Sequence, residues 1–135
     1  MTAVLVDSNV LLDVMTEDAS WFEWSASAIA RAAESFRLVI NAVIYAEVSV
    51  RYRRIEELDA ALPAPILTRE PIPFEAAFLA GKCFVDYRRR GGLKQAPLPD
   101  FFIGAHAAIA GCWLLTRDAG RYRSYFPKVP LIAPG

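Results

Sequence analysis

The sequence predicts an α/β fold in which helices cover both faces of an open, mostly parallel sheet. Three observations support this prediction. Strand-like segments alternate with segments of helical periodicity along the chain. The strand-like segments are short and almost wholly apolar, which is typical of central strands. Hydrophobic residues make up 55% of the chain, so either the sheet is buried on both faces or a partner covers an apolar surface.

Length, charge and cysteine content limit the class of protein. The 135 residues correspond to a single domain, expected over 1–135. The 15 basic and 15 acidic residues cancel, so any contact with nucleic acid must use a local patch. Cys83 and Cys112 lack the spacing of a zinc site and are expected to be reduced core residues. No apolar run reaches the roughly 18 residues of a membrane span, and no basic segment precedes the first one. We therefore expect a cytoplasmic chain.

The N-terminal half predicts two strand and helix units, because each short apolar run is followed by apolar residues at helical spacing. Ser8 is expected to cap the first helix. The predicted elements are a strand at 3–7, a helix at 8–15, a helix at 21–35, a strand at 37–41 and a helix at 42–54.

The C-terminal half begins with prolines between Pro63 and Pro73, which break regular structure. Gly91 and Gly92 are expected to end a helix whose last turn is basic. The predicted elements are a short strand at 66–68, a helix at 74–90, a loop at 93–99, a helix at 99–111 that Asp100 opens, a strand at 112–116, a turn at 117–121 and a strand at 129–133.

Four acids occupy positions that the predicted topology brings together. Asp7 ends the first strand, Asp118 follows the strand at 112–116, and Asp100 opens the helix before it. Ligands of such sheets bind at the carboxyl ends of the strands, so we expect these side chains on one rim. Glu47 lies among apolar residues at helical spacing, so it requires a polar pocket or a neutralising group.

Taken singly, three of these acids have a structural explanation as a helix cap, a helix start and a turn residue. Together they indicate more than these local structural roles, because two carboxylates about 4 Å apart repel by about 4 kcal/mol at an effective dielectric constant near 20. Such a cluster raises its own pKa values or captures a cation. Oxygen ligands without His or Cys select Mg²⁺ or Mn²⁺, which leave room for a phosphodiester and an activated water. This is the chemistry of a metal-dependent nuclease.

Four segments of the chain resemble the signature segments of PIN-domain ribonucleases, and of the VapC toxins of toxin–antitoxin pairs in particular. They are VDSNVLLD, NAVIYAEV, LPDFFIGAHA and LLTRDAGRYRSYFP. The resemblance implies a three-layer α/β/α sandwich and cleavage of RNA with Mg²⁺ or Mn²⁺. It also implies a homodimer and a VapB-like antitoxin that occludes the site. The alternative function is a catalytically silent PIN-like module that binds RNA or protein.

The resemblance also assigns roles to residues. It implies that Asp7, Glu47, Asp100 and Asp118 are the catalytic and metal-binding acids, with Asp7 and Asp100 as the first ligands. Asn9 and Thr116 fall where the family has polar or hydroxyl residues that support the site. Four basic residues form the densest positive patch, which is either a solvated helix end or a site for RNA phosphates: Arg88, Arg89, Arg90 and Lys94.

Other conspicuous residues have competing interpretations. His106, the one histidine, is expected to lie in the core rather than to act as a general base. Trp21 and Trp24 are packing residues or part of an interface. Arg117 and Arg121, which flank Asp118, contact either a phosphate or nearby acids.

Overall fold

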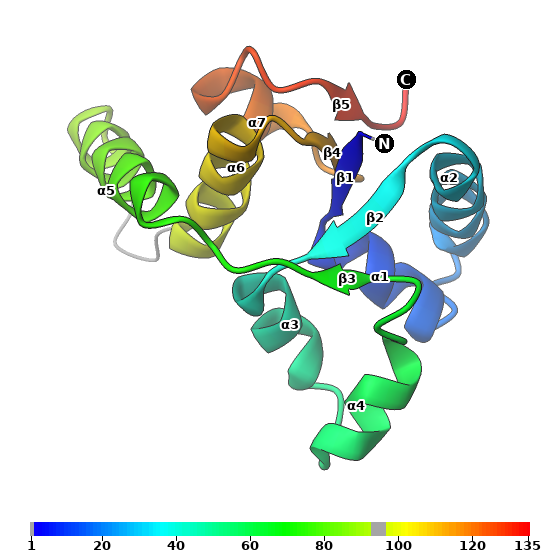
Figure 1. The fold of residues 1–135 in the computed structure, drawn as a ribbon. Helices are drawn as coiled ribbons and strands as arrows, with labels where there is room; N and C mark the ends of the chain where they lie inside the picture. Colours follow the sequence, from blue (N-terminus) through cyan, green and yellow to red (C-terminus); the bar gives the residue numbers. More distant parts are fainter. Residues whose placement is uncertain (1, 93–96) are drawn as a thin grey trace.

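The computed structural model describes residues 2–92 and 97–135. Its sheet has five parallel strands in the order β3-β2-β1-β4-β5 (Figure 1). The strands are β1 (Ala3–Val6), β2 (Arg37–Ile40), β3 (Thr68–Arg69), β4 (Trp113–Leu115) and β5 (Leu131–Ile132). The helices are α1 (Ser8–Met15), α2 (Phe22–Ser35), α3 (Ala42–Ser49), α4 (Ile55–Ala61), α5 (Phe74–Arg89), α6 (Leu98–Ala110) and α7 (Gly120–Tyr125).

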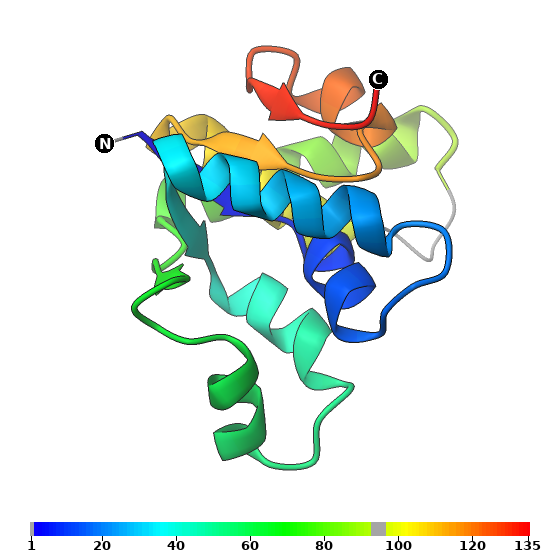
Figure 2. The same cartoon turned by 90° about the vertical axis from the view of Figure 1, so that its right-hand side faces the viewer.

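Helices cover both faces of this sheet, which confirms the predicted α/β/α sandwich. The pair α5 and α6 lies on one face, and α2 lies across the other, in front of the strands in Figure 2. Helix α3 lies at the carboxyl end of the sheet and contacts both α1 and α6. This arrangement leaves the carboxyl ends of β1 and β4 surrounded by α1, α3, α6 and α7.

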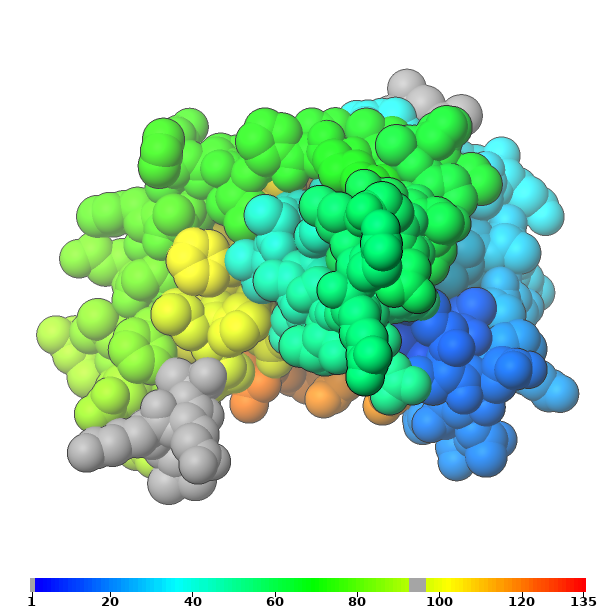
Figure 3. Space-filling view, turned by 90° about the horizontal axis from the view of Figure 1, so that it is seen from below, coloured from blue at the N-terminus to red at the C-terminus, as the bar shows by residue number. Residues whose placement is uncertain are grey.

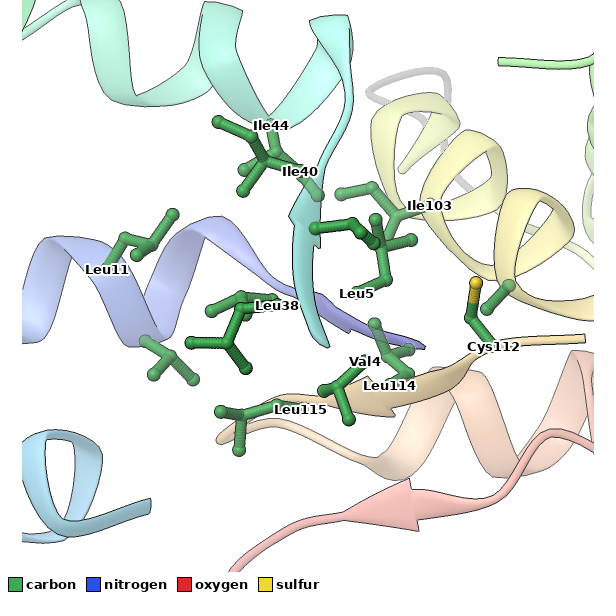
Figure 4. Packing of buried hydrophobic residues seen from close by; sticks show 14 of the residues in the cluster. Val4, Leu5, Leu11, Leu38, Ile40, Ile44, Ile103, Cys112, Leu114 and Leu115 are labelled. Atoms are coloured by element: carbon green, nitrogen blue, oxygen red, sulfur yellow. The ribbon is translucent and has the colours of Figure 1, made fainter. Parts of the chain in front are cut away.

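The core consists of the apolar strand residues that the sequence pattern indicates. Val4, Leu5, Val6, Leu114 and Leu115 are fully buried. Figure 4 shows four of them, Val4, Leu5, Leu114 and Leu115, packed together with Ile103 of α6. Strands buried on both faces must be apolar at every position, which explains the short uninterrupted runs. Cys83 and Cys112 are free and buried, as predicted.

The predicted helix at 42–54 is wrong in its extent. Helix α3 ends at Ser49, whose hydroxyl donates to the carbonyl of Ala46 at 2.6 Å, and the chain turns before α4. Serine hydroxyls that bond a preceding carbonyl weaken the helix ladder. The turn also lets α4 pack Leu58, which is 2% exposed, against the core. Helix α4 was not predicted, because it offers only this one buried position.

Three further predictions differ from the structure. The predicted turn after β4 continues into α7, a six-residue helix that buries only Tyr122 and so lacks an apolar repeat. The third strand is Thr68–Arg69 rather than 66–68. The cap of α1 is Asp7 rather than Ser8. Among the described residues, no helix is long and apolar enough to cross a membrane.

Candidate active site

The candidate site lies at the carboxyl edge of the sheet, where the chain order of the strands reverses between β1 and β4. These two strands pair directly, and the backbone N–H of Asp7 donates to the carbonyl of Leu115 at 2.9 Å. Asp7 and Thr116 therefore follow neighbouring strands side by side. Figure 3 looks onto this edge and shows α3 beside the start of α6, with α1 next to α3. Sites in open α/β sheets lie at such switch points.

Asp7 joins β1 to α1 and is held by three neighbours. Its extended backbone makes it the N-cap of α1, and its Oδ1 accepts a hydrogen bond from the N–H of Ser8 at 2.7 Å. Its Oδ2 accepts from the hydroxyl of Thr116 at 2.8 Å and from that of Tyr122 at 3.0 Å. The capping explanation is thus correct, but it accounts for only one of the two carboxylate oxygens.

The carboxyl of Asp7 is hard to ionise in this position. It is 3% exposed, and burial is the largest influence that raises its pKa from 3.8 to about 6. The negative charges of Asp100 and Glu47 raise the pKa further, while the hydroxyls of Thr116 and Tyr122 lower it because they stabilise the carboxylate. Three acids, one that follows β1, one on α3 and one on α6, are therefore close enough to affect one another.

Glu47 lies on α3 and faces this cluster. Its Oε1 accepts a hydrogen bond from the hydroxyl of Ser8 at 2.9 Å, so Ser8 contacts both Asp7 and Glu47. Burial raises the pKa of Glu47, the charge of Asp100 adds to this, and the Ser8 hydroxyl opposes it. The structure supplies the expected polar pocket, but no Lys or Arg within residues 2–92 and 97–135 forms an ion pair with Glu47.

Asp100 lies in the first turn of α6, as predicted, and has a cation as its partner. The Nη1 atom of Arg121, on α7, lies 2.7 Å from its Oδ2. The two side chains are 33% and 37% exposed, so this ion pair lies at the rim of the site. Of the two roles considered for Arg121, the structure shows contact with a nearby acid.

Asp118 lies in the loop between β4 and α7, and its backbone, rather than its carboxylate, makes the described contacts with the site. Its N–H donates to the hydroxyl oxygen of Thr116 at 3.1 Å, and the residue is exposed. Its charge contributes to the raised pKa of the neighbouring Arg117, after the hydrogen bond to Asp13 and other causes. Its role as a metal ligand stays a prediction.

Thr116 and Asn9 form a chain of hydrogen bonds that holds the carboxylate of Asp7. The hydroxyl of Thr116 is fully buried and accepts a hydrogen bond from Nδ2 of Asn9 at 3.3 Å while it donates to Asp7. Oδ1 of Asn9 accepts from the backbone N–H of Arg117 at 3.2 Å. Asn9 thus ties α1 to the loop after β4.

A second buried acid, Asp13 on α1, anchors that loop. It is 3% exposed and accepts hydrogen bonds from Nε and Nη2 of Arg117 at 2.8 and 3.0 Å, and from the hydroxyl of Ser25 at 2.8 Å. The guanidinium of Arg117 also lies 5.4 Å from the ring centroid of Trp21, which packs edge-on against Trp24. Arg117 therefore contacts an acid rather than pointing into the site. Both tryptophans pack on neighbouring side chains and are partly exposed, so their place in an interface stays a prediction.

Sequence reasoning missed Ser8 and Tyr122 as site residues. Tyr122 is 2% exposed, and burial together with the charge of Asp7 raises the pKa of its phenol. It lies in a helix that was not predicted, and 115 residues separate it from Asp7. The one available signal for Ser8 was its position directly after Asp7. His106, by contrast, is a buried core residue as predicted, with its Nδ1 3.0 Å from Nδ2 of Asn41.

The basic patch lies at the end of α5, beside the start of α6. Arg90 pairs with Asp86 at 2.8 Å, and the guanidinium of Arg88 lies 5.8 Å from the ring centroid of Phe84. Arg88, Arg89 and Arg90 are all exposed, and Lys94 lies outside the described residues.

The donor set fits a hard divalent cation, although the arrangement is not that of a ready-made metal site. Within the described part of the chain, no three Asp, Glu, His or Cys side chains converge as a ligand set. The acids nevertheless offer only oxygen donors, and burial, together with the charges of neighbouring acids, raises the pKa values of Asp7 and Glu47. A divalent ion would relieve both the repulsion and the burial of charge.

Solved structures of toxin–antitoxin complexes contain chains with the same fold. The VapBC2 complex from Rickettsia felis, bound to promoter DNA, has a chain that matches with a TM-score of 0.74, 14% identity and coverage of 98% of this chain and 99% of that chain. A VapBC-1 chain from nontypeable Haemophilus influenzae matches with a TM-score of 0.72, 16% identity and coverage of 97% of both chains. A toxin–antitoxin complex from Klebsiella pneumoniae matches with a TM-score of 0.65, 20% identity and coverage of 98% of both.

At these identities the likeness to solved structures establishes the fold, and no curated protein matches the chain. The sequence model of the PIN domain matches residues 4–126, a range that contains Asp7, Glu47, Asp100 and Asp118. The chain belongs to the PIN-domain family.

Proposed function

We propose that this protein is an endoribonuclease that hydrolyses phosphodiester bonds of RNA with Mg²⁺ or Mn²⁺. The observation that carries the proposal is the carboxyl of Asp7, which is buried beside Glu47 and Asp100 although both charges make it harder to ionise. Such an arrangement lowers the stability of the fold, and strained ionisable groups of this kind are typical of functional sites.

Asp7 and Asp100 are the first ligands of the ion in this proposal, and Glu47 and Asp118 complete the set. When bound, a divalent ion lowers the pKa of a water molecule and neutralises charge on the phosphate. The hydroxyls of Thr116 and Tyr122 hold Oδ2 of Asp7 in one orientation. Hydrogen-bond donors that fix the orientation of a carboxylate in this way typically determine how well it binds a metal.

The RNA path in this proposal runs from the acids toward the end of α5. Arg88, Arg89 and Arg90 are exposed there, and Tyr87 packs on Phe101 of α6 at a ring centroid distance of 5.7 Å. Exposed arginines beside an acidic centre bind the phosphates that flank the scissile bond. Because the net charge of the chain is zero, this local patch must supply the attraction.

A protein partner is the second part of the proposal. The similar solved structures are VapBC and other toxin–antitoxin complexes. We infer that this chain is the toxin of such a pair and that a VapB-like antitoxin occludes its acidic edge. Adding the product of a neighbouring small reading frame is expected to suppress cleavage of RNA by the purified chain.

A homodimer is the third part, and α5 supplies its surface. Phe74, Phe78 and Val85 are 89%, 69% and 44% exposed and lie along one face of this helix, whose opposite face packs on α6 (Figure 1). The first turn of α5 contains Glu75, and its last turn is basic. Two copies of α5 packed antiparallel about a two-fold axis bury the apolar stripe and place opposite charges together.

The test is to incubate purified protein with defined RNAs and Mn²⁺ and to map the ends of the products. We expect cleavage that EDTA and Asp7→Asn abolish, whereas Glu34→Gln, an exposed acid on α2, leaves the rate unchanged. Asp118→Asn tests the fourth acid, whose carboxylate has no described contact with the others. Cleavage that survives in EDTA or in Asp7→Asn contradicts the proposal.

One observation favours the alternative of a silent binding module, namely that Arg121 already neutralises Asp100. A silent module binds RNA or protein without cutting, and its melting temperature is unchanged in millimolar Mn²⁺. A nuclease that binds Mn²⁺ only in its folded state is stabilised by the ion through mass action.

A further inference from the structure

The ion pair between Arg121 and Asp100 raises a question about the proposed metal site. Asp100 is one of the two first ligands in the proposal, yet its Oδ2 lies 2.7 Å from Nη1 of Arg121. A cation and a guanidinium compete for the same carboxylate oxygen. Either this carboxylate oxygen of Asp100 is not available to the ion, or Arg121 must move when the ion binds.

The described contacts of Arg121 are few, which favours its displacement. A single nitrogen of its guanidinium contacts Asp100, so the pair lacks the two parallel hydrogen bonds of the stronger arginine–carboxylate geometry. The side chain is 37% exposed, and its other described contact is the face of Tyr87, at 5.9 Å from the ring centroid. Ion pairs that are this exposed contribute about 0 to 1 kcal/mol.

The helix that holds Arg121 is tied to the site by its next residue, so only the side chain of Arg121 would have to move. The next residue, Tyr122, is buried, and its hydroxyl donates a hydrogen bond to Asp7. Two consecutive residues of α7 thus contact the two acids proposed as first ligands. A released Arg121 stays at the rim and keeps its positive charge, because arginine does not deprotonate in proteins.

We propose that Arg121 is a displaceable internal cation, which neutralises Asp100 in the metal-free protein and contacts a phosphate of the RNA once a divalent ion takes that carboxylate. The inference rests on the proposed function, because it requires both a bound ion and an RNA substrate. It makes Arg121 an inhibitor of metal binding and a promoter of RNA binding. A residue that merely stabilises the fold would not act on the two ligands in opposite directions.

The first measurement is the affinity for Mn²⁺ without RNA, by isothermal titration calorimetry. We expect Arg121→Gln to bind Mn²⁺ about fivefold more tightly than the wild type, the factor that corresponds to about 1 kcal/mol. Arg121→Lys keeps the charge and is expected to stay near the wild-type affinity. Arg123→Gln, an exposed arginine on the same helix, controls for the general loss of positive charge. Equal Mn²⁺ affinities of Arg121→Gln and Arg123→Gln overturn the inference.

The second measurement is the binding of a short RNA with and without Mn²⁺, recorded by stopped-flow fluorescence before cleavage begins. We expect Arg121→Gln to weaken this binding about fivefold with Mn²⁺ present and to have little effect in EDTA. We also expect the salt dependence of binding with Mn²⁺ to fall by about one phosphate contact. An equal loss of RNA affinity in both conditions overturns the inference.

The proposed function and this inference fail in different ways. If the wild type neither binds Mn²⁺ nor cleaves RNA, the proposed function is wrong. If the wild type does both and Arg121→Gln binds Mn²⁺ no more tightly, only the role of Arg121 is wrong. Thermal melts in EDTA establish that each variant is folded, and Arg121→Met replaces Arg121→Gln if the latter is not.

Discussion

Replacing Asp7 by Asn should increase the stability of the metal-free protein at neutral pH while it abolishes cleavage. The carboxyl of Asp7 has a pKa of about 6 in the fold, against 3.8 in its ordinary state. A raised pKa means that the folded protein binds the proton more tightly than the unfolded chain does. Its contribution to stability is therefore fully present below about pH 3.8 and is lost as the pH rises through about 6.

The size of this loss follows from the two pKa values. Each pKa unit corresponds to 1.36 kcal/mol, so the ionised carboxyl lowers the free energy of unfolding by about 3 kcal/mol at pH 7.5. Asn does not ionise and avoids this loss. For a chain of this length, 3 kcal/mol corresponds to a shift of about 10 °C in the melting temperature.

The assay is urea unfolding of wild type and Asp7→Asn in EDTA, from about pH 4 to about pH 7.5. We expect the stability of Asp7→Asn relative to wild type to rise by about 2 to 3 kcal/mol over this range. Added Mn²⁺ should then stabilise the wild type more than the variant. Glu34→Gln should show no such trend. The argument from burial and neighbouring charge is refuted if the free energy of unfolding of Asp7→Asn, relative to that of the wild type, stays constant or falls as the pH rises.

Three further predictions test other parts of the structure. Tyr122→Phe removes a hydrogen-bond donor to the carboxyl of Asp7 and should raise the pKa of that carboxyl. The acid limb of the pH–rate profile should therefore shift to higher pH in steady-state kinetics. Gly104→Ala places a methyl group 2.3 Å from the ring of Phe126 and should destabilise by about 1 to 2 kcal/mol in urea unfolding. Gly81→Ala, a matched change with no atom within 4 Å, should stabilise by about 1 kcal/mol, and the same sign for both variants contradicts the packing explanation. Phe78→Arg should convert the dimer to a monomer in light scattering, and an unchanged mass argues against α5 as the interface.

The local elements of the fold were largely predictable from the sequence. The run AVLV at β1 has no polar residue, and its strand is buried on both faces as such runs require. Pro99 in the first turn and Gly111 at the C-cap mark the ends of α6, and Gly111 has the left-handed φ of 70° that glycine favours. Helices α4 and α7 were not predicted, because each buries a single residue and leaves no repeat to detect.

The candidate site was predictable only in part. Asp7, Glu47 and Asp100 were chosen from their positions at element ends or on an apolar helix, and the structure brings them near one another. Arg121 was left between two roles, and its contact with Asp100 follows from how α7 packs on α6. The carboxylate of Asp118 keeps its predicted role without a described contact that supports it.

The sequence by itself determined the class of the fold, its strands and the acids worth testing, because apolar runs, caps and turn residues act over a few neighbouring positions. Only the tertiary structure decided which groups surround Asp7. Thr116 and Tyr122 lie 109 and 115 residues away along the chain and reach it through the pairing of β4 with β1 and the packing of α7. Hydrogen bonds over such separations depend on strand order and twist, which no local pattern specifies.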